Sequence, residues 1–123
     1  MTTTFQLFGR PLPPSLNKRI HYREKKRLRD GYTWEFISQR NRFHWPASPV
    51  AKCVMVITRF GVRQLDRDNL YGSMKLPIDG LRAAGIIEDD TEEHIDLTVK
   101  QERVSSWKDQ RVEIAITEVK ETE

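Results

Sequence analysis

The stretch VAKCVMVITRF, residues 50–60, decides the fold, because apolar side chains occupy both of its faces. Successive side chains of an extended chain point to opposite sides. One side of this segment therefore carries Val54 and Val56, and the other carries Met55 and Ile57. A strand that is apolar on both sides belongs in the interior of a sheet, so the segments around it are expected to supply neighbouring strands and covering helices.

The part of the chain before this strand predicts three segments. Residues 5–9 begin a short strand, which the prolines that follow would end. Residues 33–44 predict a short amphipathic helix, ended by Pro46 and Pro49. Between them, residues 15–31 have no clear apolar period and are expected to form a charged loop or arm.

A second helix is expected over residues 70–84, with Gly85 as its stop. Its apolar positions recur on one face: Tyr71, Met74, Ile78 and Leu81. Pro77 and Gly80 disturb this pattern, so the helix is expected to be kinked or to begin later than Leu70.

Two alternating segments close the chain, residues 95–104 and 111–119, and they are expected to pair as a hairpin. The order strand, helix, strand, helix, hairpin predicts an α+β fold in which helices flank a mixed sheet. The length of 123 residues suits one such domain, spanning residues 1–123.

The composition, 37% hydrophobic and 32% charged, is typical of a soluble protein. No apolar run is long enough to cross a membrane, and the first nine residues lack the features of a signal peptide. The single cysteine, Cys53, has no internal disulfide partner, and its apolar surroundings predict a buried, unreactive thiol. A reducing, cytoplasmic location is therefore expected.

The net charge of +3 hides an uneven distribution. Residues 1–63 hold 13 Lys/Arg and 3 Asp/Glu, whereas residues 64–123 hold 8 Lys/Arg and 15 Asp/Glu. A basic half joined to an acidic half suggests a surface that binds a polyanion beside one that binds a cation.

The basic residues near the N-terminus suit contact with DNA phosphates, which gives affinity without sequence reading. They are Lys18, Arg19, Arg23, Lys25, Lys26, Arg27 and Arg29. The alternative is a solvated charged loop. Four aromatic residues could stack on bases that are not paired, although core packing is favoured for Trp34: Tyr22, Tyr32, Trp34 and Trp45.

Carboxylates gather between residues 66 and 90. Asp66 and Asp68 follow the expected central strand, and on an extended chain their side chains would point the same way. Asp89 and Asp90 follow the helix. Depending on how this helix packs, they could lie next to Asp66 and Asp68 or about one helix length away from them. Grouped carboxylates repel one another unless a cation lies among them, and Mg²⁺ prefers oxygen ligands together with water and phosphate.

Each of these residues also has a structural interpretation. Asp68 or Asn69 could cap the following helix, and Asp90–Glu93 has the spacing of a capping box. Lys75 and Asp79 lie four residues apart on one helical face, and they could form no more than a surface ion pair.

The motif as a whole resembles a known family. The run Asp66-Arg67-Asp68-Asn69-Leu70, then Lys75, Asp79-Gly80-Leu81, Ala84-Gly85 and Asp89-Asp90, closely resembles the signature of RusA-type Holliday-junction resolvases. Pro13-Pro14-Ser15-Leu16-Asn17 is similar to the family's N-terminal motif, and residues 113–118 are similar to its last strand. The resemblance covers nearly the whole chain.

This resemblance implies a homodimeric phage or prophage nuclease that nicks four-way DNA junctions symmetrically with Mg²⁺. It implies that Asp66, Asp68 and Asp90 are catalytic metal ligands, that Asp89 is an adjacent metal ligand, and that Lys75 is the catalytic lysine. Lys75 lies farther from Asp68 than in the best-known resolvase of the family, as though residues 71–74 contained a three-residue insertion.

Other functions stay open from the sequence. The chain could be a nuclease for flaps or other branched DNA, because a metal site does not specify the shape of the substrate. It could also bind DNA without cutting it, if the lengthened segment displaces Lys75. A purely structural domain with separated charges would bind no DNA.

Overall fold

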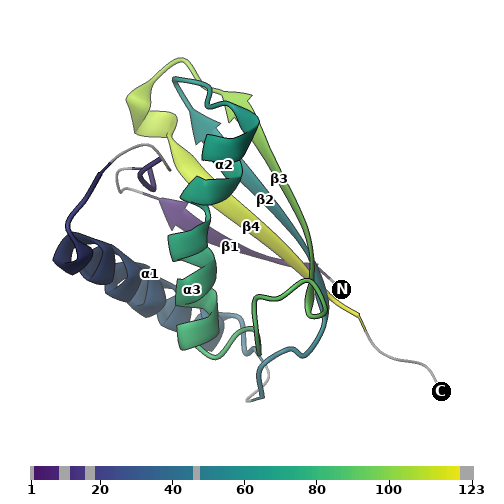
Figure 1. Ribbon diagram of the computed structural model, residues 1–123. Helices are drawn as coiled ribbons and strands as arrows, with labels where there is room; N and C mark the ends of the chain where they lie inside the picture. The colour runs from purple at the N-terminus through teal and green to yellow at the C-terminus, as the bar shows by residue number, and fades with distance from the viewer. Residues whose placement is uncertain (1, 9–11, 16–18, 46–47, 120–123) are drawn as a thin grey trace.

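A computed structural model describes residues 2–8, 12–15, 19–45 and 48–119. Within these residues a mixed sheet of four strands carries helices on one face (Figure 1). The elements are β1 (Thr2–Phe8), α1 (Tyr22–Arg42), β2 (Cys53–Gly61), α2 (Arg67–Ser73), α3 (Lys75–Ala83), β3 (Ile95–Arg103), the 3₁₀ turn η1 (Trp107–Asp109) and β4 (Arg111–Glu118). The expected α+β fold with a mixed sheet is confirmed.

The strand β2 lies inside the sheet, in the order β1-β4-β2-β3. It runs parallel to β3 and antiparallel to β4. Met55 and Ile57 are fully buried on the helix side, whereas Val54 on the other side is 36% exposed. The interior position expected from residues 50–60 is confirmed, although the strand begins only at Cys53 and helices cover only one face.

The strands β3 and β4 do not pair with each other, so the expected hairpin is wrong. Cys53 of β2 lies opposite Ile95 of β3 on one side and opposite Glu118 of β4 on the other. Neighbouring strands lie about 4.8 Å apart, so residues 104–110 cross roughly 10 Å over the end of β2. Alternation in the sequence identifies a strand but does not identify its partner.

The helix α1 is longer than expected and takes in most of the basic segment. It begins at Tyr22, where His21 Nδ1 accepts a hydrogen bond from the backbone N–H of Arg23. The loop expected over residues 15–31 is therefore wrong from residue 22 onward. The first turns of α1 carry charged rather than apolar side chains, so hydrophobic periodicity did not reveal them.

The helix ends at Arg42, before the prolines that were expected to end it. His44 has a positive φ of 55°, and the backbone N–H of Trp45 donates to the carbonyl of Arg40 at 3.0 Å. A left-handed residue of this kind closes many helices. Pro46 lies outside the described residues.

The side of α1 that faces the core carries Tyr32, Phe36 and Gln39. Trp34 lies two residues from both aromatic side chains, about 200° around the helix, and it is 70% exposed. The core position favoured for Trp34 is therefore wrong.

Two short helices replace the single helix expected over residues 70–84. The helix α2 ends at Ser73, and Met74 separates it from α3. Pro77 lies in the first turn of α3. Backbone N–H groups there make no hydrogen bond within the helix, so the missing N–H of proline does not disturb it. Gly85 has a φ of 75° and follows the end of the segment, as expected.

The helices α1 and α3 pack closely where α3 lacks a side chain. A Cβ atom at Gly80 would lie 3.2 Å from Cβ of Tyr32 and 3.3 Å from the ring of Phe36. Phe36 in turn meets Phe5 of β1 edge to face, with ring centroids 6.2 Å apart. This contact fixes α1 against both α3 and the sheet.

The side chain of Gln39 also joins α1 to the edge strand β1. Its Nε2 donates to the carbonyl of Gln6 at 2.6 Å, and its Oε1 accepts from the N–H of Gln6 at 2.7 Å. Unpaired backbone groups on an edge strand invite association with other chains. The buried amide of Gln39 occupies both groups of Gln6.

We expect Gly80→Val to lower the free energy of unfolding by on the order of 2 kcal/mol, because the new side chain has to displace Tyr32 or Phe36. Ala83→Val, at an exposed site of the same helix, should cost less than about 1 kcal/mol. Urea denaturation followed by circular dichroism measures both variants. Equal stability of the two would contradict the close contact.

Candidate functional site

The segment between β2 and α2 is fixed by two glutamine side chains. Gln101 of β3 binds both backbone groups of Leu65: its Oε1 accepts from the N–H at 2.9 Å, and its Nε2 donates to the carbonyl at 2.7 Å. Gln110 accepts from the N–H of Val62 at 3.0 Å. These hydrogen bonds determine where Asp66 enters α2.

Asp66 is the N-cap residue of α2. Its Oδ1 accepts from the backbone N–H of Asn69 at 2.9 Å, and its Oδ2 accepts from the side-chain amide of Asn69 at 2.8 Å. Asp68 lies in the first turn of the helix and is exposed. The prediction that Asp68 or Asn69 caps the helix is therefore wrong. The prediction that the chain is extended through Asp66 and Asp68 is also wrong, because Asp68 belongs to α2.

Asp89 and Asp90 follow a segment anchored at the opposite end of β2. Ile87 forms a parallel bridge with Val50, and the N–H of Glu88 donates to the carbonyl of Val50 at 2.9 Å. Val50 precedes β2, whereas Asp66 follows it, so the fold does not bring the two aspartate pairs together (Figure 1).

Asp89 and Asp90 share one cation, Arg82 of α3. The Nη1 atom of Arg82 lies 3.8 Å from Oδ1 of Asp89 and 3.6 Å from Oδ1 of Asp90. The backbone N–H of Asp90 donates to Oδ1 of Asp89 at 2.7 Å, and this hydrogen bond is the main cause that lowers the pKa of Asp89, with smaller contributions from the charges of His94 and Arg82. Residues 91–94 form a turn instead of a helix, so the capping box at Asp90–Glu93 is wrong.

Among the residues that the structure describes, no three His, Cys, Asp or Glu side chains are grouped so that they could hold a metal ion. Asp66 and Asp68 supply two carboxylates at the start of one helix. Mg²⁺ is commonly held by one or two carboxylates, with water and substrate phosphate in the other positions. Two carboxylates are thus the kind of donor set that Mg²⁺ takes together with a phosphate, and Asp89 and Asp90 do not join this pair in the observed arrangement.

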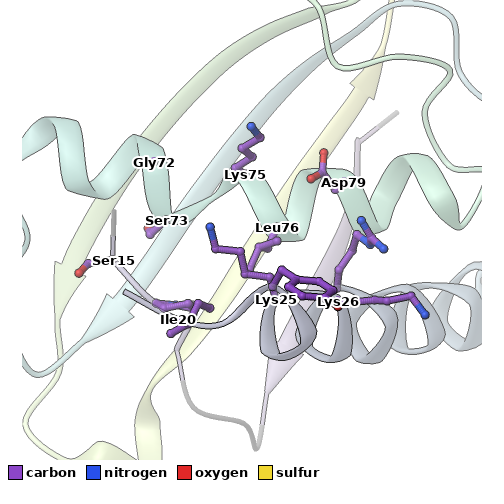
Figure 2. A pocket seen from close by; sticks show the side chains of 12 residues that line it. Ser15, Ile20, Lys25, Lys26, Gly72, Ser73, Lys75, Leu76 and Asp79 are labelled. Atoms are coloured by element: carbon purple, nitrogen blue, oxygen red, sulfur yellow. The ribbon is translucent and has the colours of Figure 1, made fainter. Parts of the chain in front are cut away.

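A cavity of about 520 Å³ opens between the first turns of α1 and the junction of α2 with α3 (Figure 2). Its charged lining consists of Lys25, Lys26 and Arg29 from α1 and Lys75 and Asp79 from α3. The neutral lining consists of Pro14, Ser15, Ile20, Tyr22, Gly72, Ser73 and Leu76. The fold thus joins the lysine singled out by the motif to three of the basic residues expected to contact DNA.

The charge in this cavity is only partly neutralised. Lys26 Nζ and Arg29 Nε lie 3.7 and 3.9 Å from carboxylate oxygens of Asp30. Lys25 and Lys75 make no ion pair within the described part of the chain, and they border the cavity from two different helices (Figure 2). Like charges placed together favour an anion between them, and lysine is a common ligand of phosphate.

Three of the other basic residues, Arg19, Arg23 and Arg27, do not line the cavity. Arg23 and Arg27 are exposed on α1, and Arg27 pairs with Glu24 at 2.8 Å. Arg19 precedes the helix and is exposed. Lys18 lies outside the described residues, so its expected contact with DNA has no structural description.

Sequence reasoning missed several residues near these sites. Asp90 lines a second cavity, of about 490 Å³, together with Glu92, Asp96 and Tyr71. Trp107 of η1 is 72% exposed at the turn that crosses the end of β2. The only signal in the sequence is its polar surroundings, Ser105, Ser106 and Lys108.

Cys53 is buried, and burial raises the pKa of its thiol to about 11, as expected of an unreactive cysteine. Each described helix is too short or too polar to cross a membrane.

Comparison with known proteins adds no relative: neither a family model nor a curated protein matches this chain. The resemblance to RusA-type resolvases therefore rests on the motif residues themselves.

We expect Asp66→Ala to lower the free energy of unfolding by about 1 kcal/mol, because it removes the N-cap of α2. Asp66→Asn should keep most of the stability, since an amide oxygen accepts the same hydrogen bond. Asp68→Ala should cost less than about 0.5 kcal/mol. Thermal denaturation measures all three variants, and equal costs for Asp66→Ala and Asp68→Ala would contradict the cap.

Proposed function

We propose that this chain is a Mg²⁺-dependent endodeoxyribonuclease of the RusA type that acts as a homodimer on four-way DNA junctions. The basic residues of α1 contact phosphates, and Asp66 and Asp68 bind Mg²⁺ together with the phosphate that is cut. The proposed setting is the cytoplasm, in phage or prophage recombination and repair.

The observation that carries this proposal is the position of Lys75 beside the basic turns of α1. The motif pointed to Lys75 for catalysis, and the charge pattern separately pointed to Lys25, Lys26 and Arg29 for DNA contact. All four side chains line one cavity. A shared location supports a single polyanionic ligand for both groups.

Each group has a distinct part in the proposed reaction. Bound Mg²⁺ would activate water and neutralise charge on the phosphate. Lys75 lies about the length of α2 beyond Asp68, roughly 10 Å at 1.5 Å per residue. In this proposal it therefore neutralises the phosphate charge of the DNA strand beside the cut. Asp89 and Asp90 join the site in this proposal only if DNA binding rearranges the segment after α3.

The separation of the aspartate pairs favours one alternative, a RusA-like protein that binds junctions without cutting them. A nuclease for flaps or other branched DNA is the second alternative. A gel of labelled junction, flap and duplex, with and without Mg²⁺, separates the three functions.

We expect Asp68→Asn to reduce Mg²⁺-dependent nicking of a synthetic four-way junction on the order of a hundredfold, while junction binding is retained. Asp66→Asn should do the same without unfolding α2. Asp109→Asn, which removes an exposed carboxylate of η1, is the matched control and should cut normally. Equal cleavage of duplex and junction would be compatible with a nuclease but would exclude a preference for junctions.

The proposed homodimer has a candidate surface on the face of the sheet opposite the helices. The strand register places Thr4, Ala115, Val56 and Thr98 in one row across all four strands. These side chains are small or β-branched and uncharged, which suits the packing of one sheet on another. Two-fold symmetry would supply one active site for each of two opposed strands.

We expect light scattering to show a dimer for the unmodified chain and a monomer for Ala115→Arg, because a charged side chain in this row repels its symmetry mate. Ser38→Arg, on the exposed side of α1, should remain a dimer. A folded Ala115→Arg dimer would exclude this face as the interface.

A further inference from the structure

We propose that the cavity between α1 and α3 binds one unpaired nucleotide of a DNA strand, with its phosphate at Lys25 and Lys75 and its base against the apolar wall. The inference rests on the proposed function in one respect, that the ligand is DNA. It adds a reason why a branch point would be preferred to a duplex.

The size of the cavity suits one nucleotide. Its volume of about 520 Å³ falls within the roughly 300–1,000 Å³ of pockets for small ligands. Ile20 and Leu76 form part of its wall and are partly buried. A base that remains paired inside a duplex has no access to such a wall, whereas a base outside the stack does.

The charges suit a phosphate rather than a neutral ligand. Four cationic side chains and one carboxylate line the cavity. Asp30 lies close to Lys26 and Arg29, which leaves Lys25 and Lys75 as the pair without an ion-pair partner in the described part of the chain. These two lysines come from different helices and line the same cavity (Figure 2), so a phosphate group bound in the cavity would meet positive charge from both helices.

The cavity lining includes an aromatic side chain that is exposed to solvent. Tyr22 lines the cavity and is 67% exposed, and its ring lies 4.6 Å from that of His21 at an angle of 33°. The phenol therefore has a neighbour that restricts its position and an exposed surface on which a base can stack. Stacking of this kind accepts any base, which suits recognition of DNA shape rather than sequence.

A branched molecule supplies such a nucleotide at low cost. Extruding a base costs least where pairing and stacking are already disturbed, as they are where strands exchange between arms. The cavity would therefore favour the branch point, and α2 leads directly from Asp68 to the cavity wall at Gly72 and Ser73.

The test is photocrosslinking from 5-iododeoxyuridine, placed either at the branch point of a four-way junction or about ten base pairs into one arm, roughly one helical turn away. Ca²⁺ replaces Mg²⁺ so that binding is observed without cleavage. We expect the branch-point probe to crosslink to Tyr22, as mapped by peptide mass spectrometry, and the arm probe not to do so.

Two pairs of variants make the test specific. Tyr22→Ala should abolish the branch-point crosslink, whereas Trp34→Ala, which removes an exposed aromatic elsewhere on α1, should retain it. Lys25→Ala combined with Lys75→Ala should weaken binding of a short single strand about tenfold. Lys100→Ala, at an exposed site on β3, should leave that affinity unchanged.

The outcomes separate this inference from the proposed function. A junction that is cut in Mg²⁺ without a branch-specific crosslink to Tyr22 would overturn the nucleotide site and leave the nuclease. The crosslink without any cleavage would support the site and exclude the nuclease. Equal crosslinking from branch and arm would show that the cavity does not select an unpaired nucleotide.

Discussion

The contact between α1 and α3 at Gly80 is the interaction on which the rest of the structure depends. Since Gly80 has no side chain, Tyr32 and Phe36 approach the backbone of α3 closely, and Phe36 carries the contact on to Phe5 in the sheet. The first turns of α1 are too charged to be held by an apolar stripe of their own. Their position beside α3 follows from the packing farther along the same helix. The cavity lined by Lys25 and Lys75 is therefore a consequence of how the core is packed.

A second constraint fixes the acidic end of the molecule. The amide of Gln101 binds both backbone groups of Leu65, so the chain leaves β2 in one defined direction and Asp66 caps α2. Tyr71 then anchors this helix to β3, because its hydroxyl accepts from the N–H of Val99 at 3.2 Å. The cap occupies both carboxylate oxygens of Asp66, whereas the carboxylate of Asp68 has no hydrogen bond or ion pair among the described residues. The two aspartates of the motif thus differ in their surroundings, and Asp68 is the freer to take a ligand.

The sequence predicted the interior strand, because apolar residues on both sides of residues 50–60 leave few other positions for it. It also predicted the stop at Gly85, where a left-handed residue is needed. It did not predict the first turns of α1, since charged residues there give no periodic hydrophobic signal. It also did not predict the partner of β4, since the alternation of apolar and polar residues is the same in a hairpin and in a crossover. The distance between the aspartate pairs was open for a similar reason: it depends on how Ile87 pairs with Val50, which no local pattern encodes.

The position of Lys75 follows from the length of the segment before it. Asp68 and Lys75 are seven residues apart, which corresponds to roughly 10 Å and almost two full turns of a helix. The break at Met74 then starts a new helix with Lys75 at its first position, beside the basic turns of α1. The chain thereby keeps its carboxylates and its amino groups at the two ends of α2, an arrangement that suits a ligand with several phosphates along its length better than a ligand with one.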